Sequence, residues 1–244
     1  MSLTSLPAGF CAAVFGAGGG IGRALVEALE QDPRCAAVHA GSRKPSVTAC
    51  GPKVSPFTFE LGDEASIAAA SETIGEPDIV IVATGRLHGP GLAPEKSLRS
   101  IESQSLQEAF AINAIGPAMI ARHVLPRLPR ARRSIFAALS AKVGSISDNR
   151  LGGWHSYRSS KAALNMLIRT FAVELTRTHP QAVCVALHPG TVDTPLSKPF
   201  QAGVVADRLF TPAASANYLL AVLDKLQPEN SGRLFGWDGR EITP

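Results

Sequence analysis

Short, continuously apolar runs alternate with longer amphipathic segments along almost the whole chain, and this alternation restricts the possible fold more than any other feature. Such runs are typical of strands buried on both faces, and the segments between them carry apolar residues at helical spacing. Strands that alternate with helices predict a parallel sheet covered by helices on both sides. The expected fold class is therefore α/β, a single-domain, doubly wound parallel sheet.

The expected elements follow from this pattern. The expected strands are residues 10–15, 35–42, 56–61, 78–84, 132–140, 182–190 and 232–239. The expected helices are residues 21–31, 63–74, 105–125, 157–177 and 211–226. No repeat, low-complexity segment or linker interrupts this order, and 244 residues is a size at which α/β folds are often a single unit. Residues 1–244 are therefore expected to form one domain.

Composition and apolar pattern exclude several other classes of protein. Charged residues make up 18% of the chain, too few for a disordered or coiled-coil protein, and 45% of the residues are hydrophobic. No apolar run is long enough to span a membrane, and residues 1–10 lack the features of a signal peptide. Four scattered cysteines show no metal-ligand spacing, and Cys11 and Cys184 lie in apolar runs where burial is expected. We expect a reduced, cytoplasmic protein without zinc and without a membrane partner.

A glycine-rich turn, GAGGGIG, joins the first expected strand to the first expected helix. Glycines at this place permit a tight turn and let the backbone approach a pyrophosphate at the helix N-terminus. A plain glycine-rich loop is the alternative, but the position between strand and helix favours the phosphate cradle. The residues expected to contact a dinucleotide here are Gly16, Gly18, Gly19, Gly20, Ile21 and Gly22.

The end of the second expected strand bears on the choice of dinucleotide. Units that prefer NAD usually carry an acidic residue there, which accepts a hydrogen bond from the ribose 2′-hydroxyl. This chain has Ser42, Arg43 and Lys44 instead. A solvent-exposed basic loop would explain these residues equally well in isolation, but beside the glycine turn they favour a 2′-phosphate. NADP(H) is therefore the expected cofactor, and NAD(H) is the less favoured one.

Tyr157 and Lys161 lie four residues apart at the start of an expected helix, and therefore on one face of it. A surface tyrosine stacked on a lysine stem is the ordinary explanation of such a pair. The chemical explanation is a proton donor, because a phenol pKa of about 10 is lowered by a neighbouring ammonium and by an oxidised nicotinamide ring. Only the other motifs of the chain decide between the two.

Taken in order, these motifs resemble those of the short-chain dehydrogenase/reductase family. They are the GxxxGIG turn at 16–22, the strand end VATG at 82–85, Asn113, Ser140, the pair Tyr157 and Lys161, and the loop PGTVDT at 189–194. The resemblance spans nearly the whole chain. It is closer still to the C-factor-like, sniffer-type carbonyl reductase branch of the family.

The resemblance implies a Rossmann-type fold and a set of site residues. The implied catalytic residues are Asn113, Ser140, Tyr157 and Lys161. Besides the glycine turn, the implied cofactor contacts are Ser42, Arg43, Leu61, Ala83, Thr84, Gly85, Tyr157, Lys161, Pro189, Gly190, Val192 and Thr194. Tyr157 would protonate the developing alkoxide, Ser140 would donate to the substrate oxygen, and Lys161 would also bind the nicotinamide ribose. Asn113 would hold a water that relays protons to Lys161, or, in the alternative, would be a polar cap on a helix kink.

Three residues near the expected cofactor depart from the family pattern. Phe15 stands where threonine is common, and Val82 stands where asparagine is common. Both positions support loops, so they are expected to change cofactor affinity without removing the chemistry. Glu60 replaces the usual aspartate near the adenine, and its longer side chain puts that contact in doubt.

The expected function is an NADP(H)-dependent oxidoreductase that transfers a hydride between nicotinamide and a small or medium carbonyl or alcohol. The alternative is a dinucleotide-binding signalling or redox-sensor protein of C-factor type with little turnover, which would not need the complete Ser-Tyr-Lys set. The arginine run at 127–133 raises a third class, nucleic-acid binding, but a basic loop is favoured because the net charge is only +4.

Two further expectations concern metals and assembly. His88, Trp154 and His155 flank substrate-side loops without a carboxylate or cysteine at ligand spacing, so no metal is expected. The helices that carry Asn113 and follow Tyr157 have more apolar residues than one sheet face needs. A homodimer or homotetramer is therefore expected.

Overall fold

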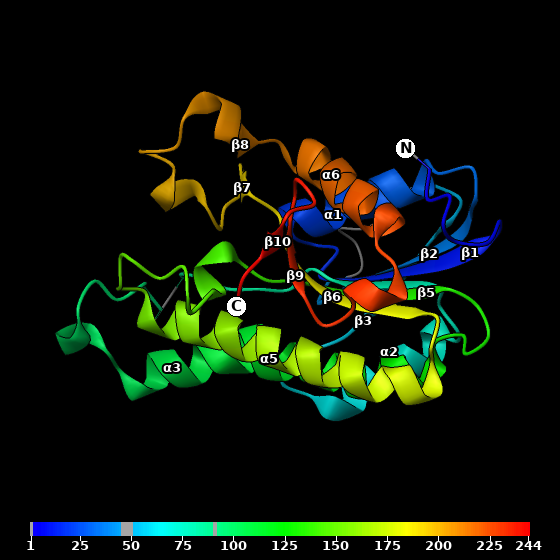
Figure 1. Ribbon diagram of the computed structural model, residues 1–244, viewed down its shortest axis with the longest axis horizontal. Coiled ribbons are helices and arrows are strands. Elements are labelled where there is room, and N and C mark those ends of the chain that lie inside the picture. Colours follow the sequence, from blue (N-terminus) through cyan, green and yellow to red (C-terminus); the bar gives the residue numbers. More distant parts are fainter. Residues whose placement is uncertain (1, 45–50, 90–91) are drawn as a thin grey trace.

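A single eight-stranded sheet runs through the computed structural model, which describes residues 2–44, 51–89 and 92–244 (Figure 1). Its strands are β1 (Phe10–Phe15), β2 (Cys35–Ser42), β3 (Val54–Thr58), β4 (Ile79–Val82), β5 (Ser134–Leu139), β6 (Ala182–His188), β9 (Leu234–Gly236) and β10 (Glu241–Ile242). Their order is β10-β9-β6-β5-β4-β1-β2-β3, and every pair is parallel except β9 with β10. The chain starts in the middle and winds outward both ways, so the predicted doubly wound fold is confirmed.

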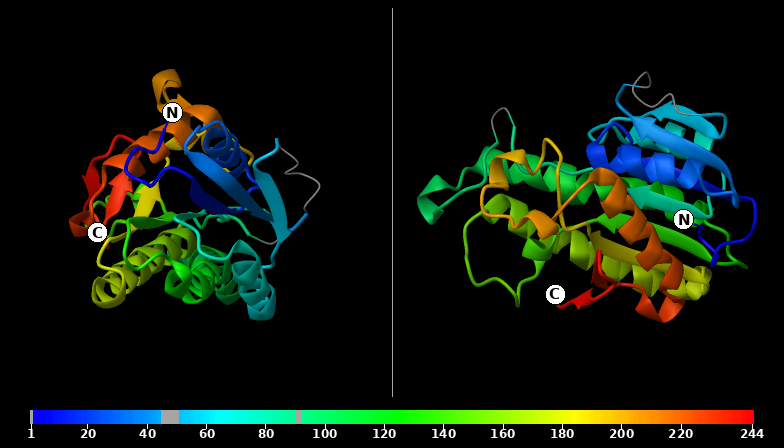
Figure 2. Two further views of the ribbon diagram at one scale, coloured as in Figure 1. Left: turned by 90° about the vertical axis from the view of Figure 1, so that its right-hand side faces the viewer. Right: turned by 90° about the horizontal axis from the view of Figure 1, so that it is seen from above.

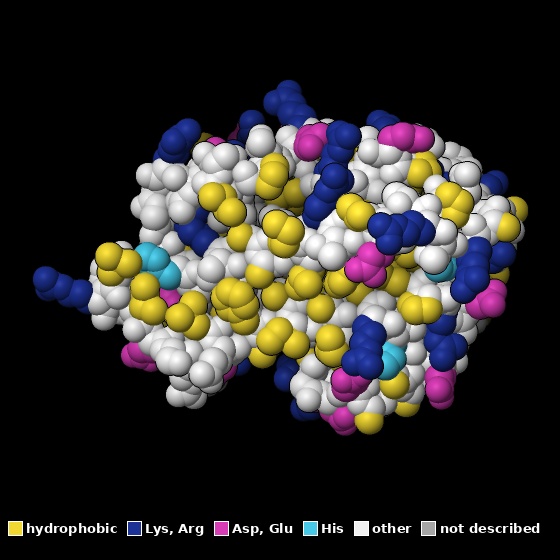
Figure 3. All heavy atoms as spheres, turned by 60° about the horizontal axis from the view of Figure 1, so that its bottom comes forward, with side chains coloured by type: hydrophobic (Ala, Val, Ile, Leu, Met, Phe, Trp, Pro, Cys, Tyr) yellow, Lys and Arg dark blue, Asp and Glu magenta, His cyan; other side chains and the backbone are white. Residues whose placement is uncertain are grey.

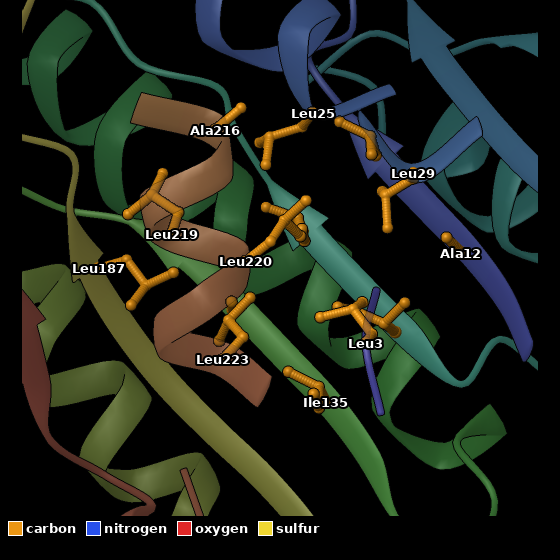
Figure 4. Packing of buried hydrophobic residues seen from close by; sticks show 14 of the residues in the cluster. Leu3, Ala12, Leu25, Leu29, Ile135, Leu187, Ala216, Leu219, Leu220 and Leu223 are labelled. Carbon is orange, nitrogen blue, oxygen red and sulfur yellow. The ribbon is translucent and has the colours of Figure 1, made fainter. Parts of the chain in front are cut away.

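Helices cover both faces of the sheet, as Figure 2 shows. One face carries α1 (Gly20–Glu30) and α6 (Pro212–Lys225), and the other carries α2 (Glu64–Ile74), α4 (Gly116–Val124) and α5 (His155–Thr178), with α3 (Ser103–Phe110) beside α5. Leu25, Leu219 and Leu223 fill the space between α1, α6 and the sheet (Figure 4). Burying each such side chain stabilises the fold by about 1.5–3 kcal/mol. No helix among the described residues has the length and apolar character needed to cross a membrane.

The expected helix at 105–125 is not continuous. It consists of α3, a π-helical turn η3 (Ala111–Ile115) and α4. Asn113 lies in the middle of the π turn and is fully buried. Pro117 contributes to the break because it has no N–H to donate to the carbonyl four residues earlier. π turns of this kind are frequent at functional sites.

The strands expected at 10–15 and 35–42 match the structure at both ends, and the other expected boundaries shift by at most three residues, apart from two local differences. The expected strand at 232–239 ends at Gly236, and the chain then turns back to form β10 antiparallel to β9. The segment expected as a loop before α6 contains the 3₁₀ turns Lys198–Phe200 and Ala206–Arg208, and β8 (Leu209–Phe210) pairs with β7 (Thr191–Val192). This small β7–β8 sheet is separate from the main sheet.

The arginine run at 127–133 has structural partners. Arg132 forms an ion pair of 2.8 Å with the buried Asp78, and Arg133 donates to the carbonyls of Leu223 and Leu226. These contacts connect the segment before β5 to Asp78 and to the end of α6, so the two arginines have a structural role in a connecting loop.

The cysteines differ in burial. Cys184 and Cys35 are buried, whereas Cys11 is only half-buried because it lies near the start of β1, and Cys50 lies outside the described residues. The expectation of burial therefore holds for Cys184 and is wrong for Cys11.

Candidate active site

A cleft of about 650 Å³ opens at the carboxyl ends of β1, β2 and β4. Ligands of open α/β sheets bind at this edge, where the strand order reverses. The residues of the predicted set that line the cleft are Gly16, Gly18, Gly19, Ser42, Arg43, Leu61, Ala83, Thr84 and Gly85. The structure therefore brings these residues together from four separate chain segments.

The glycine turn has the close backbone packing that is expected of a pyrophosphate-binding turn. Gly16 has φ +95°, and a Cβ atom there would lie 2.9 Å from the carbonyl carbon of Ala83. A Cβ atom on Gly22 would lie 2.1 Å from the Gly16 oxygen, so both positions require glycine. Helix α1 follows with Gly19 as its N-cap and no side-chain cap. Its first N–H groups are thus available to an anion, which the helix dipole also favours.

The loop at 189–194 packs against this turn. A Cβ atom on Gly20 would lie 2.7 Å from Cγ2 of Thr194. Gly190 has φ +78°, and the rings of Phe210 and Trp237 leave no room for a side chain there. Val192 is buried in β7. Pro189, Gly190, Val192, Thr194 and Ile21 do not line the cleft itself.

The cationic end of β2 lies at the rim of the cleft. Ser42 is buried and its hydroxyl donates to the Lys44 carbonyl at 2.8 Å, while the Arg43 side chain is exposed. Among the described residues of the lining, Glu60 is the one acid, and its Oε1 accepts from the N–H of Leu61 at 3.0 Å. The Thr84 hydroxyl is buried in the opposite wall without a hydrogen-bond partner. These donors suit a polar, anionic ligand.

Three of the implied catalytic residues, Asn113, Tyr157 and Lys161, lie close together next to Gly85, which lines the cleft. Lys161 is buried, and its Nζ donates to the carbonyl of Leu139, the residue before Ser140, at 2.8 Å. The same Nζ lies 5.8 Å from the centre of the Tyr157 ring. A Cβ atom on Gly85 would lie 3.5 Å from this Nζ and 3.6 Å from Oδ1 of Asn113. Asn113, Tyr157 and Lys161 therefore lie close together, and Ser140 directly follows the residue whose carbonyl holds Lys161.

Asn113 acts as a clamp on the chain after β4. Its Oδ1 accepts from the Arg86 N–H at 2.9 Å, and its Nδ2 donates to the Arg86 carbonyl at 2.9 Å and to the Ser160 hydroxyl at 3.1 Å. Both amide protons are therefore used. A relay water at Asn113 would therefore not receive an amide proton, and this role stays a prediction, while the position in the π turn also agrees with the alternative of a polar residue at a helix kink.

Ser140 is buried and its hydroxyl donates to Oδ1 of Asn165 at 2.7 Å. Asn165 is absent from the predicted site. It lies four residues after Lys161 and eight after Tyr157, so helical spacing alone places it on the same face of α5. To donate to a substrate oxygen, the Ser140 hydroxyl has to turn away from Asn165.

Burial governs the two titratable groups. It raises the pKa of Tyr157 to about 12 and lowers the pKa of Lys161 to about 7. Burial therefore dominates the pKa of both groups. The expectation that the ammonium and an oxidised nicotinamide ring lower the phenol pKa concerns the protein with cofactor bound and stays a prediction. Lys161 has the Leu139 carbonyl as its partner in a buried setting, which disfavours the charge of the ammonium.

Aromatic side chains surround Tyr157 on its outer side. The Trp154 ring lies 6.4 Å from the Tyr157 ring and 5.0 Å from the Phe200 ring. Phe200 in turn contacts His88 at 5.6 Å between ring centres, and Nε2 of His88 lies 3.1 Å from the Pro195 carbonyl oxygen. These residues form an aromatic wall next to the phenol. Within the described part of the chain, no group of three or more His, Cys, Asp or Glu residues is placed to hold a metal ion.

A buried acid near this wall is also missing from the predicted set. Glu95 lies between β4 and α3, and its carboxylate accepts hydrogen bonds from Ser156 at the start of α5. The partners are 61 residues apart, so no local pattern reveals the pair.

Comparison with known proteins agrees with this geometry. A sequence model described as short chain dehydrogenase matches residues 11–204. C-signal of Myxococcus xanthus is 35% identical over 147 residues, which cover 60% of this chain and 82% of that protein. The 1-hydroxy-2-glutathionyl-2-methyl-3-butene dehydrogenase of Rhodococcus sp. (strain AD45) is 30% identical over 193 residues, or 79% of this chain and 81% of that protein.

Solved structures show the same fold. The NADPH-bound carbonyl reductase from chicken fatty liver superposes with a TM-score of 0.82 and 25% identity, covering 98% of this chain and 100% of that one. Carbonyl reductase Sniffer of D. melanogaster has a TM-score of 0.83 and 20% identity, covering 96% and 99%. The predicted resemblance to the family, and to its C-factor-like branch, is confirmed by the family model and by C-signal, and the Sniffer reductase shares the fold. The chain is an oxidoreductase and belongs to the short chain dehydrogenase family.

Proposed function

We propose that this protein is an NADP(H)-dependent reductase of small or medium carbonyl compounds, or the corresponding alcohol dehydrogenase, built as one domain over residues 1–244. The observation that supports the proposal is the position of Lys161, which lies beside Tyr157, bonds to the residue before Ser140, and lies next to Gly85 of a cleft that the glycine turn also lines. The NADPH-bound state of the chicken carbonyl reductase supports the choice of cofactor.

The cleft residues present fit a dinucleotide. The glycine turn and the start of α1 would hold the pyrophosphate, Arg43 and Ser42 would hold the 2′-phosphate, and Lys161 would hold the nicotinamide ribose. When bound, the nicotinamide supplies or accepts the hydride. Leu61, Ala83, Thr84, Gly85, and the residues of the 189–194 loop would enclose it.

The protein's own residues handle the proton and the substrate oxygen. Because the pKa of Tyr157 is raised to about 12, the phenol is fully protonated at neutral pH and ready to donate to an alkoxide, which is a stronger base. The Ser140 hydroxyl would turn from Asn165 to the substrate oxygen and stabilise its developing charge. The Lys161 ammonium, held by the Leu139 carbonyl, would favour the phenolate left behind.

The aromatic wall limits the substrate. Trp154 lies beside Tyr157, and Phe200 and His88 continue the wall outward from Trp154 as a largely apolar surface. A carbonyl compound with an apolar or aromatic body fits this wall better than a highly charged one. The small β7–β8 sheet and the 3₁₀ turns between its two strands would cover the bound substrate.

The test is a screen of aldehydes, ketones and quinones as substrates, in which the loss of NADPH absorbance measures turnover. Tyr157→Phe is the control because it removes the proton donor and leaves the cleft whole. Turnover is expected to fall at least ~100-fold, the lower scale for a lost general acid, with NADPH affinity nearly unchanged. A Phe variant that reduces the best substrate at the native rate refutes the assignment.

The similarity to C-signal supports a second candidate, a signalling protein that binds the dinucleotide and turns over little. The same screen separates the two. NADPH binding without reduction of any carbonyl, and equal behaviour of the native protein and Tyr157→Phe, would favour signalling.

We also propose a cytoplasmic homodimer or homotetramer without nucleic-acid or membrane partners. Figure 3 shows apolar side chains gathered across the face formed by the helices that include α5. Ile115, Met166 and Val173 are 53%, 67% and 45% exposed. Symmetric pairing of such a face is the commonest route to an oligomer. Sedimentation at micromolar concentration is expected to show no monomer.

A further inference from the structure

Helix α5, which carries Tyr157 and Lys161, starts without an ordinary N-cap. Its N-cap residue, Trp154, has φ 52° and ψ 42° and makes no side-chain capping bond. N-cap residues usually have extended backbone and a small polar side chain. Trp154 is also the one non-glycine residue in the described part of the chain with positive φ. A bulky residue keeps this conformation only where its surroundings enforce it.

Glu95 enforces it from another part of the chain. Its main-chain oxygen accepts from the Trp154 N–H at 2.5 Å. Its carboxylate accepts from the Ser156 N–H at 3.3 and 3.2 Å, and the Ser156 hydroxyl donates to the same carboxylate. Gly153 packs closely against the same residue, since a Cβ atom on Gly153 would lie 3.3 Å from the main-chain oxygen of Glu95. One residue thus satisfies donors on both sides of His155.

The carboxylate is ionised in this position. Glu95 is 4% exposed, and burial alone would raise its pKa. The hydrogen bonds from Ser156 outweigh burial and keep the pKa of the carboxyl below its ordinary value. A negative charge at a helix N-terminus also interacts favourably with the helix dipole. Substitution of Glu95 would therefore leave buried donors without a partner.

We propose that Glu95 is a positioning residue, which caps α5 from outside the helix and thereby holds Trp154 against Tyr157 and Phe200. The proposal rests on the proposed carbonyl reduction. Trp154 is the link, because its ring contacts both the phenol and the aromatic wall. Without the cap, the first turn of α5 loosens, Trp154 leaves its left-handed conformation, and the phenol loses its fixed position.

The test compares Glu95→Gln with Glu102→Gln, an exposed glutamate of the same segment. The glutamine at 95 keeps the shape but loses the charge and one acceptor. We expect kcat to fall about 10- to 100-fold, the scale of a small misplacement of a reacting group. The Kd for NADPH is expected to stay unchanged, because Glu95 does not line the cofactor cleft. Glu102→Gln is expected to match the native protein in both measurements.

A second readout follows Trp154 directly. The chain has two tryptophans, so a Trp237→Phe background leaves Trp154 as the single fluorescent tryptophan. In this background Glu95→Gln is expected to shift the emission to the red and to increase quenching by acrylamide. Ser156→Ala is expected to cause a smaller fall in kcat, and Glu95→Gln should cost less in the Ser156→Ala background, because the two residues share one interaction.

The outcomes separate the two proposals. Native kcat in Glu95→Gln, or a lowered kcat with native Trp154 emission, overturns the positioning role. If Glu95→Gln does not fold, as judged by circular dichroism, kcat and the Trp154 emission are compared between Ser156→Ala and the native protein instead. If the native protein reduces no carbonyl compound, the proposed function fails, and the emission of Trp154 still decides whether Glu95 holds it.

Discussion

Replacement of Asn113 by alanine tests how much the hydrogen bonds of this site residue contribute to the free energy of unfolding. The native amide makes three hydrogen bonds, two to the Arg86 backbone and one to the Ser160 hydroxyl. A net contribution of about 1 kcal/mol for each bond gives a loss of about 3 kcal/mol in the free energy of unfolding. Ser160 keeps its second bond, to the Tyr157 carbonyl, so its hydroxyl does not become fully unpaired.

Urea unfolding followed by circular dichroism measures this loss. The slope of the free energy against urea should stay constant while the midpoint falls. Asn217→Ala is the matched control, because Asn217 is exposed on α6 and alanine is the better helix former. A loss below about 1 kcal/mol in Asn113→Ala, or the same value in both variants, would refute the clamp.

Three further predictions concern cofactor, pH and assembly. Arg43→Ala should weaken NADPH binding by roughly 10- to 150-fold, which corresponds to the loss of a charge-assisted hydrogen bond, and should barely change NADH binding. The dissociation constants of both nucleotides, measured for the native protein and the variant, check this. Burial lowers the pKa of Lys161 in the folded protein to about 7, whereas the pKa in the unfolded chain is about 10.4. Between these two pH values the unfolded chain binds one proton more than the folded protein. The free energy of unfolding therefore rises with pH in this range, by up to about 1.4 kcal/mol per pH unit. Urea midpoints measured from neutral to alkaline pH should therefore rise more steeply in the native protein than in Lys161→Met, and parallel curves would contradict the burial of this charge. Met166→Glu places a charge on the exposed face of α5 and should shift sedimentation toward the monomer, whereas an unchanged oligomer would place the interface elsewhere.

Local patterns explain why much of the fold was predictable. Strands such as β4 are short apolar runs buried on both faces, and Gly22 is required by a contact with Gly16 within one strand-turn-helix unit. The spacing of Tyr157 and Lys161 fixes their proximity as soon as a helix forms. These features need no knowledge of distant residues.

The remaining features depend on pairings between distant segments. Glu95 and Ser156 are 61 residues apart, and Ser140 and Asn165 are 25 apart, so neither pair shows in the local pattern. The π turn at Asn113 had a signal in Pro117, which interrupts an otherwise apolar helical pattern. The pKa of Tyr157 depends on burial, which a lysine four residues away does not reveal.

The small β7–β8 sheet has a consequence for how this architecture diversifies. It leaves the main sheet after Gly190 and returns at Thr211, which caps α6, so it is attached at two closely defined points. Surface segments attached in this way tolerate changes of length and sequence far better than core strands. A chimera that exchanges only residues 195–210 for the corresponding segment of a relative keeps the 189–194 loop against the glycine turn. Such a chimera is expected to change substrate preference while cofactor binding is retained.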